Sequence, residues 1–330
     1  MNKLYFTTLF NSTYLCKGLA MCDSLDKVCS DYCIYIFAYD EVSYKFLLSK
    51  KNKNAIIISL EKLEEYFPEL LHIKSERSFA EYCWTTTSYT ILYCLENFKI
   101  NHCTYIDADL YFFSNPIILF EELKHGDVLI TKHRYTTQYD QSKTSGIYCV
   151  QFMTFKQNDN SLSVLKWWKN KCYQWCYNKY EDGKFGDQKY LDDWPERFNN
   201  IVILKNLGGG VAPWNVQQYN VLYKKNVVYA INKKSGEKFD IVFYHFHYFR
   251  YTKLLFLYEY VLGPYLLDNN VINYIYNPYR KKISEFHRQL LEAGFMDSNI
   301  GYEDMKISKI RAIAHLLKNI FKRDKIISFK

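Results

Sequence analysis

The sequence predicts an α/β fold with helices on the faces of a single mixed, mostly parallel sheet. Short apolar runs alternate with longer segments whose apolar residues recur at helical spacing. The alternation starts at once, with a strand expected at Leu4–Phe10, a helix at Tyr14–Leu25 and a strand at Cys33–Ala38. That order is typical of parallel β-α-β units. No G-x-G-x-x-G or G-x-x-x-x-G-K-[ST] loop follows a predicted strand, which argues against dinucleotide dehydrogenases and P-loop enzymes.

The same patterns predict the elements that follow. Further strands are expected at Ala55–Ser59, Cys103–Ile106, Asp127–Thr131, Gly146–Phe155 and Phe239–Phe249. Helices are expected at Leu60–Phe67, Ser78–Phe98 and Ser161–Tyr180, with a short one after the turn at Asn115-Pro116. The first of these helices stops at Pro68, since proline cannot continue a helix.

Composition is that of a globular chain with room for a large core. Of the 330 residues, 48% are hydrophobic and 24% charged, and the net charge of +8 favours anionic partners in general. We predict a main domain over residues 1–255 and a helical, basic C-terminal extension over residues 256–330. From Lys306 the apolar residues repeat at spacings of three and four among lysines and arginines, which predicts an amphipathic cationic helix. Such a helix either docks on the anionic inner leaflet of the cytoplasmic membrane or packs on the domain with a solvated basic face.

The ten cysteines contain no C-x-x-C pair, and most lie in apolar segments, so we expect reduced thiols. Cys29 with Cys33, and Cys172 with Cys176, have a spacing that zinc ligands on a helix can share, but buried packing is favoured for both pairs. The N-terminal stretch is too polar for a signal peptide, and no later run is long enough to span a membrane. The expected location is the cytoplasm, either throughout or peripherally at the inner face of the membrane.

An Asp-x-Asp pair stands directly after the predicted strand Cys103–Ile106. Asp107 and Asp109 flank Ala108, and aromatic residues resume at Tyr111. On a strand, positions i and i+2 point to the same side, so the two carboxylates can converge on one cation. Proteins typically bind Mg²⁺ or Mn²⁺ through one or two carboxylates and leave the other positions to water and substrate phosphates. The pair therefore suggests a substrate that carries a diphosphate.

Two later segments suit the neighbourhood of a substrate. Asp187 and Gln188 follow a glycine-containing turn and are expected at the start of a helix, where Asp187 is either an N-cap or a catalytic carboxylate. Three successive glycines, Gly208–Gly210, permit turns with positive φ or a close approach of the backbone to a ligand.

Two histidines alternate on the predicted strand Phe239–Phe249. His245 and His247 are separated by one residue and are therefore expected to face the same way. Imidazole is an acceptable ligand for Mn²⁺, although a histidine on an aromatic strand is also commonly a hydrogen-bonded core or surface residue.

Taken in order, these segments resemble nucleotide-diphospho-sugar transferases of the GT-A fold, particularly the retaining enzymes of glycosyltransferase family 8 and the bacterial surface-polysaccharide transferases close to them. The resemblance covers roughly residues 1–255. Its motifs are Tyr5-Phe6-Thr7-Thr8 with Tyr14–Ala20, then Tyr105–Asp109, Asp187–Leu191, Gly210–Asn215 and Tyr244–His247.

The resemblance implies a transferase that depends on Mn²⁺ or Mg²⁺. Asp107 and Asp109 would bind the metal, with His245 or His247 completing the shell. Asp187 and Gln188 would be the catalytic pair, with Asp187 orienting sugar hydroxyls and Gln188 lying against the anomeric carbon. Further donor contacts are expected from Thr7, Thr8, Tyr14, Lys17, Arg77, Ala108, Gly209, Gly210 and Arg250.

The family also sets the expected partners. The donor is a nucleotide-diphosphate sugar, with UDP favoured, and the acceptor is an oligosaccharide or a lipid-linked glycan, as in lipopolysaccharide or capsule synthesis. The family's usual C-terminal pattern places His, Gly and Lys close together to hold the phosphates, whereas Tyr248-Phe249-Arg250 follows His247 here. Arg250 is the expected replacement for that lysine.

Retention of the anomeric configuration is favoured, because an amide at the anomeric carbon suits front-face transfer whereas a double displacement needs a carboxylate nucleophile. An inverting route needs a general base, for which Asp187, Asp192 and Asp193 are the candidates.

Three other classes of protein are alternatives to this interpretation. A nucleotide-sugar or glycan-binding protein of the same fold would act without turnover, but Asp107, Asp109 and Asp187 are all present, which favours an enzyme. A phosphatase would carry its Asp-x-Asp pair after the first strand, whereas this pair follows a later one. A nucleic-acid binder is disfavoured because no RRM signature or zinc finger occurs.

Overall fold

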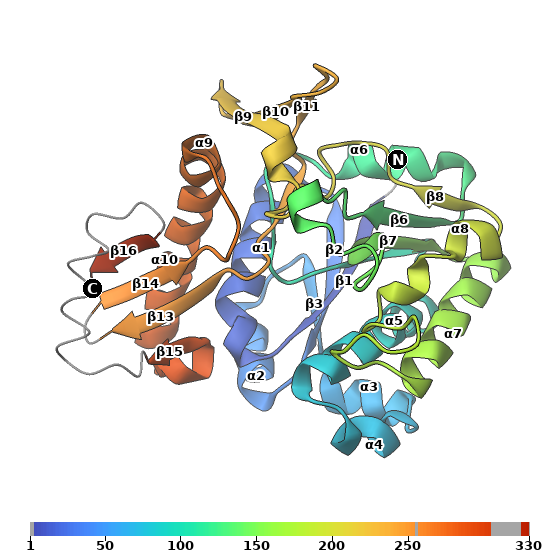
Figure 1. Cartoon of the computed structure of the whole chain (residues 1–330). Coiled ribbons are helices and arrows are strands. Elements are labelled where there is room, and N and C mark those ends of the chain that lie inside the picture. Colours follow the sequence, from blue (N-terminus) through green and yellow to red (C-terminus); the bar gives the residue numbers. More distant parts are fainter. Residues whose placement is uncertain (1–2, 255–256, 305–324, 330) are drawn as a thin grey trace.

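The structure is a computed structural model that describes residues 3–254, 257–304 and 325–329. Its centre is a seven-stranded sheet with the strand order β3-β2-β1-β4-β7-β6-β8 (Figure 1). The pairs that involve β7 are antiparallel and the other neighbouring pairs are parallel, which confirms the predicted mixed, mostly parallel sheet. The strands are β1 (Leu4–Phe10), β2 (Tyr32–Ala38), β3 (Ala55–Ser59), β4 (His102–Ile106), β6 (Val128–Lys132), β7 (Tyr148–Lys156) and β8 (Ile201–Ile203).

Helices cover both faces of this sheet, because its central strands are apolar on both sides. In β2, Ile34 and Ile36 enter one core cluster, with residues of α1 and α2, while Tyr35 and Phe37 enter the other, with residues of α3, α5 and α7. The helices of this part of the chain are α1 (Leu15–Val28), α2 (Glu41–Lys50), α3 (Leu60–Tyr66), α4 (Leu70–Ile73), α5 (Phe79–Asn97), α6 (Ile117–Phe120), α7 (Asp159–Gln174) and α8 (Trp194–Arg197).

Helix α5 confirms the prediction for Ser78–Phe98, since Ser78 and Glu81 form a capping box at its start. Helix α7 corrects the prediction for Ser161–Tyr180, because it ends at Gln174. Trp175 is extended, and the chain then folds back in a tight turn that pairs Glu181 with Lys184. This turn needs positive φ at Asp182 and Gly183, so the chain leaves the helical path.

The predicted strand Phe239–Phe249 is wrong as a single element. It divides into β11 (Lys238–Asp240) and β12 (Phe243–His245). The two pieces pair with different partners: β11 joins β10 and β9 in a small antiparallel sheet, and β12 joins β5 in a two-stranded ribbon. His247 therefore lies beyond the end of β12. The partner strands are β5 (Leu110–Phe112), β9 (Tyr219–Lys224) and β10 (Val227–Asn232).

The segment after residue 256, predicted to be helical, contains strands as well as helices. A four-stranded sheet has the order β15-β13-β14-β16 beside α9 and α10 (Figure 1). The amphipathic helix predicted from Lys306 falls on residues 305–324, outside the described residues. Among the described residues, no helix is long and apolar enough to cross a membrane. The elements are β13 (Arg250–Leu254), β14 (Leu257–Val261), α9 (Asn269–Val271), α10 (Asn277–Glu292), β15 (Tyr302–Asp304) and β16 (Lys325–Phe329).

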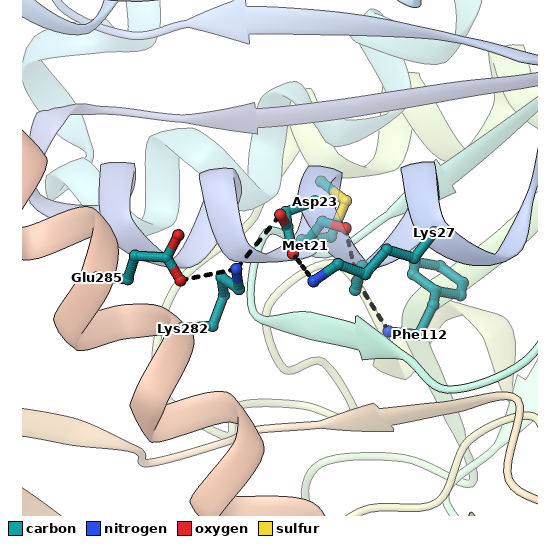
Figure 2. A network of polar contacts seen from close by, with 7 residues as sticks. Met21, Asp23, Lys27, Phe112, Lys282 and Glu285 are labelled. Carbon is teal, nitrogen blue, oxygen red and sulfur yellow. Dashed lines mark hydrogen bonds and ion pairs between the residues drawn. The ribbon is translucent and has the colours of Figure 1, made fainter. Parts of the chain in front are cut away.

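Helix α10 packs on α1 and shares a core cluster with it. Lys282 of α10 reaches Asp23 of α1 at 3.4 Å and Glu285 of its own helix at 2.8 Å (Figure 2). On the same helix α1, Ser24 accepts a hydrogen bond from the Phe112 N–H of β5 at 3.0 Å. These contacts connect α10, α1 and β5. The predicted boundary at residue 255 stays a prediction, although α10 shares this core with the residues before it.

Candidate active site

The two aspartates of the Asp-x-Asp pair lie in the tight turn between β4 and β5. The Leu110 N–H donates to the Asp107 carbonyl at 3.2 Å and closes the turn. We expected the carboxylates to converge because strand positions i and i+2 share a side; they do converge, but through this turn and not through the pleat of a strand. The Asp107 N–H donates to the Gln151 carbonyl of β7 at 3.1 Å, which fixes the turn against the central sheet.

The ribbon of β5 and β12 brings His245 to this turn. Its register pairs His245 with Leu110, the residue after Asp109, and the Phe246 N–H donates to the Asp109 carbonyl at 3.0 Å. The imidazole Nε2 of His245 then lies 3.1 Å from Asp109 Oδ1 and 3.7 Å from Asp107 Oδ2. Residues far apart in the sequence thus form one group.

Gln151 fixes the orientation of the His245 ring, and sequence reasoning missed it. The Oε1 atom of Gln151 lies 2.9 Å from His245 Nδ1. An amide oxygen only accepts, so Nδ1 donates and Nε2 is left to face the carboxylates. The sequence pattern that could have identified Gln151 is a lone amide in the buried, otherwise mostly apolar strand β7.

The charge of His245 stabilises the two carboxylates, and the carboxylates stabilise the charged imidazole, while the two carboxylates repel each other. Burial raises the pKa of Asp107 to about 6, against the attraction of His245. Burial also acts to raise the pKa of Asp109, but His245 and Lys17 together hold it well below its ordinary value. Although burial opposes a charged imidazole, Asp109 and Asp107 keep the pKa of His245 well above its ordinary value.

This donor set fits a divalent cation. Within the described residues, one ligand atom from each of Asp107, Asp109 and His245 lies within 4.8 Å of the others. Two carboxylates and one imidazole leave further positions of a six-coordinate ion to water or phosphate oxygens. The group therefore meets the chemistry expected of Asp107 and Asp109.

Of the two predicted histidines, His245 has the geometry of a ligand. His247 Nδ1 instead lies 3.0 Å from the Tyr265 hydroxyl, and its ring packs edge-on against Trp214, at 5.3 Å between centroids. Burial, with the charge on His245, lowers the pKa of His247 to about 4. Asp107, Asp109 and His245 line one cavity, and His247 lines it too, outside the group of candidate ligands.

Asp187 and Gln188 line this cavity, whose volume is about 590 Å³. The expected helix start is a short 3-10 turn, Lys189–Leu191, whose cap residue is Gln188, so Asp187 is not its N-cap. Only 6% of Asp187 is exposed, and burial, aided by the negative charge of Asp107, raises its pKa well above the ordinary value. The Gln188 amide donates to the Ser145 carbonyl at 2.7 Å, and the Trp168 indole donates to the Asp187 carbonyl at 2.8 Å.

Four of the other predicted donor contacts also line the cavity. They include Ala108, between the two aspartates, and Arg250, at the start of β13. Lys17 is buried, and its ammonium lies 4.1 Å from the centre of the Tyr14 ring.

The structure places five predicted donor contacts away from the cavity lining. Thr7 and Thr8 are fully buried inside β1, and the residues that follow them, from Leu9 to Asn11, line the cavity. Arg77 donates to the Tyr173 carbonyl at 3.3 Å, and its guanidinium lies 3.8 Å from the centre of the Tyr177 ring.

The other two are glycines that pack against neighbouring elements. A Cβ on Gly209 would meet Leu204 at 2.6 Å, and a Cβ on Gly210 would meet Thr131 at 2.8 Å. Their loop still serves the site, because the Val211 carbonyl after them accepts from the His245 N–H at 2.9 Å.

Aromatic side chains that sequence reasoning did not assign to the site also line the cavity. The 18% aromatic content could have indicated such a surface, but filling of the core was the default interpretation of those residues. They are Phe10, Phe79, Trp84, Tyr105, Tyr135, Tyr139, Phe185, Trp214, Tyr248, Phe249 and Tyr265.

Two of the three carboxylates considered as bases for an inverting route are engaged elsewhere. Asp192 accepts from the Ile147 N–H at 2.7 Å and from Lys189 at 2.7 Å, while Asp193 pairs with Arg197. Neither lines the cavity that contains Asp107, Asp109 and His245, the candidate metal-ligand group.

Comparison with solved structures assigns the fold. The crystal structure of the galactosyltransferase LgtC in complex with donor and acceptor sugar analogs is similar over 86% of this chain and 96% of its own, with a TM-score of 0.50 and 9% identity. The chain therefore has the fold of GT-A glycosyltransferases, as the sequence motifs predicted.

Comparison with known sequences assigns the family. The uncharacterised protein YfnF of Bacillus subtilis is 30% identical over 257 residues, which are 76% of this chain and 82% of YfnF. YfnD of the same bacterium, also uncharacterised, is 28% identical over 288 residues, which are 84% of this chain and 88% of YfnD. No protein-family model matches the chain. The chain belongs to the family of YfnF.

Proposed function

We propose that this protein is a metal-dependent glycosyltransferase that moves a sugar from a nucleotide-diphosphate sugar to a glycan acceptor. The observation that carries the proposal is the convergence, in one cavity, of the Asp107–Asp109–His245 group with Asp187 and Gln188. These residues come from separate parts of the chain, and each type suits one part of the reaction. The fold is the one that LgtC, a galactosyltransferase, also has.

The donor's diphosphate would lie at the metal-ligand group. Asp107, Asp109 and His245 would hold the cation, and the imidazole ligand favours Mn²⁺ over Mg²⁺. When bound, a divalent cation acts as a Lewis acid that stabilises negative charge on the departing nucleoside diphosphate. Lys17 and Arg250, on the wall of the same cavity, add positive charge for the phosphates. We propose UDP as the nucleotide from the family resemblance.

The transferred sugar would lie at Asp187 and Gln188. The Gln188 amide nitrogen is held by the Ser145 carbonyl, so its Oε1 is free to face a developing positive charge at the anomeric carbon. Asp187 would accept hydrogen bonds from sugar hydroxyls. We propose retention of configuration, which is supported by the positions of Asp192 and Asp193 outside this cavity.

The acceptor would be a glycan, since the aromatic side chains around the cavity offer flat apolar faces to sugar rings. A role in the synthesis of a bacterial surface polysaccharide, such as lipopolysaccharide or capsule, follows from the family resemblance. So does the proposal that the chain works in the cytoplasm or at the inner face of the membrane.

Donor binding is the first test. The melting temperature of the full chain would be measured with a panel of UDP, GDP, TDP and CMP sugars, each with Mn²⁺ and with EDTA. We expect one nucleotide sugar to raise the melting temperature only when Mn²⁺ is present. In Asp109→Asn this increase should vanish, because the variant loses a charged ligand but keeps the side-chain shape.

The matched control is Asp31→Asn, since Asp31 is exposed and lies outside the cavity. It should keep the full increase. If no nucleotide sugar raises the melting temperature with or without metal, the proposal is wrong. A metal-dependent increase without any hydrolysis or transfer would instead identify a nucleotide-sugar binding protein.

A further inference from the structure

A second cavity lies beside the turn that carries Gln188. Its volume is about 630 Å³, and its walls come from α7, the loop after α7, the 3-10 turn Lys189–Leu191, and α8. Gln188 lines the first cavity, whereas Lys189 and Tyr190, the next two residues, line the second. No described residue lines both cavities. The function proposed above makes no use of the second one.

Three partly exposed aromatic rings line this second cavity and are held in place. The Trp167 and Tyr190 rings stand edge to face, with 6.3 Å between centroids and an interplanar angle of 88°. The Tyr190 hydroxyl donates to the Trp175 carbonyl at 2.9 Å, and the Trp175 indole donates to Glu181 at 3.3 Å. Such rings offer fixed apolar faces, against which the C–H face of a sugar ring packs with little loss of conformational entropy.

The cations of this cavity outnumber their carboxylate partners. Lys189 pairs with Asp192, and Arg197 pairs with Asp193. Lys171 and Lys184 lie over the rings of Trp167 and Trp175, at 5.7 and 5.0 Å, and Arg197 also lies over the Trp167 ring, at 4.9 Å. No carboxylate in the described part of the chain forms an ion pair with Lys171 or Lys184. Two positive charges are therefore left to attract an anionic group of a ligand.

A buried acceptor on the same wall is also unsatisfied. Asp193 Oδ2 pairs with Arg197, but Asp193 Oδ1 has less than 1 Å² of exposed area and no hydrogen-bond partner. The Asp193 side chain as a whole is nevertheless 46% exposed, and a carboxylate on the wall of the cavity suits a hydroxyl donor and repels an anionic group placed directly beside it. This favours a ligand with both hydroxyls and an anionic group over the closely spaced phosphates of a nucleic acid.

We propose that the second cavity binds an anionic saccharide. Its sugar rings pack on Trp167, Trp175 and Tyr190, its carboxylate or phosphate lies between Lys171 and Lys184, and a hydroxyl donates to Asp193. The inference does not depend on the proposed transfer reaction. If that reaction is also correct, the second cavity holds part of the acceptor beside the turn that carries Gln188.

The test is calorimetric titration of the full chain in EDTA at low salt, without donor. The probes are tetragalacturonate, which carries carboxylates, glucose 6-phosphate, which carries a phosphate, and neutral maltotetraose. We expect at least one anionic probe to bind, and maltotetraose to bind more weakly. The double variant Lys171→Glu/Lys184→Glu should weaken anionic binding about tenfold or more, as two close charge contacts become repulsive.

Three further proteins make the result decisive. Lys53→Glu/Lys124→Glu changes the same net charge on exposed lysines outside both cavities and should bind like the wild type. Lys184→Ser provides a milder variant should the double variant melt early, and it should also weaken binding. Asp109→Asn should leave saccharide binding unchanged, which separates this site from the donor site.

The proposal is overturned if neither anionic probe binds, or if the charge-reversed variant binds as well as the wild type. It is also overturned if Asp109→Asn abolishes binding, since the ligand would then occupy the first cavity. An oligothymidylate added as a further probe should bind more weakly than the saccharides, and tighter binding would assign the cavity to nucleic acid. Binding of tetragalacturonate alone, or of glucose 6-phosphate alone, identifies the anionic group.

Discussion

Asp187 is a largely buried carboxyl group near a second carboxyl group, that of Asp107. Its pKa lies well above the ordinary value of about 4, because burial and then the charge of Asp107 disfavour ionisation. Between these two pKa values the folded chain binds a proton that the unfolded chain has lost. The free energy of unfolding therefore falls as the pH rises through this window.

We predict that Asp187→Asn raises the melting temperature of the metal-free protein at about pH 8, and that the gain shrinks as the pH approaches about 4. The amide keeps the shape of the side chain and cannot ionise. Transfer activity should be lost, because a cation bound at Asp107 favours an ionised Asp187, and an amide is a poorer acceptor for sugar hydroxyls than that carboxylate. Melting curves across this pH range check the first part. Asp159→Asn, at an exposed position, should show no such trend, and a lower melting temperature for Asp187→Asn at high pH would contradict the prediction.

Metal affinity should fall in acid. Protons compete with the cation at Asp107, whose pKa is about 6, and at His245, whose pKa is raised. We predict that the apparent affinity for Mn²⁺ drops at least about tenfold between about pH 7 and pH 5.5, since binding must release these protons. Asp109, whose pKa is low, contributes nothing in this range. Titration of Mn²⁺ by electron paramagnetic resonance measures the affinity, and a flat profile would exclude this ligand set.

Gln151 should affect Mn²⁺ affinity only by orienting the His245 ring. Gln151→Leu removes the acceptor that holds the Nδ1–H, so we predict a 10- to 100-fold loss of Mn²⁺ affinity, as is typical when a partner of a ligating histidine is removed. Calorimetry with Mn²⁺ measures it. Gln157→Leu makes the same change at an exposed position and should bind normally. Equal affinities for the two variants would show that Gln151 has no part in orienting the ring.

At the scale of elements, the ribbon of β5 and β12 and the glycine loop that supports it decide the position of His245. Gly210 has a φ of +97°, and a Cβ there would lie 2.8 Å from Thr131 Cγ2 and 3.1 Å from Gln151 Nε2. Gly236, whose φ is +75°, has open space at the same position. The two glycines share an unfavourable backbone conformation for other residues and differ in crowding.

We predict that Gly210→Ala lowers the free energy of unfolding by about 1–3 kcal/mol more than Gly236→Ala, because only the first also overpacks the core. It should lower Mn²⁺ affinity as well, since the added methyl group presses on Gln151. Urea unfolding and metal titration of the two variants provide the comparison. Equal losses of stability would mean that the loop moves aside without cost.

At the scale of the whole molecule, α10 packs against the segment that carries His245. Tyr279 is fully buried, and its ring stacks on Phe246 with 3.7 Å between centroids. Phe246 directly follows His245, the candidate metal ligand. Tyr276 of the preceding turn contacts the Tyr244 hydroxyl at 3.2 Å. The C-terminal segment and the ribbon of β5 and β12, which carries His245, therefore share one packed layer.

We predict that Tyr279→Ala costs about 3–5 kcal/mol of stability in a single cooperative transition, as removal of a fully buried aromatic ring usually does. Urea unfolding followed by tryptophan fluorescence measures this, and Lys281→Ala, at an exposed position on the same helix, should change little. Loss of the C-terminal segment in a separate transition, with the rest unchanged, would instead support the predicted boundary at residue 255.

Local patterns were enough for the elements that bury their own periodic faces. The strand at Leu4–Phe10 and the helix after Ser78 lie as predicted, because a short, mostly apolar run and a capping box are local properties. The strand Phe239–Phe249 failed, since its halves pair with partners that the sequence does not identify. The predicted end of α7 at Tyr180 is wrong, because Trp175 is already extended and leads into the turn that follows.

The sequence by itself determined the fold class and the residue types of the site, since Asp-x-Asp, Asp-Gln and the paired histidines are local motifs that follow predicted apolar runs. Only the tertiary structure decided which of these side chains meet. It places His245, and not His247, beside the two aspartates, and it places Gln151 against the His245 ring. It also places Thr7, Thr8 and Arg77 away from the cavity lining. The physical reason is that these contacts depend on strand register and on close packing between segments far apart in the sequence, whereas a sequence pattern reports only the periodicity of one segment.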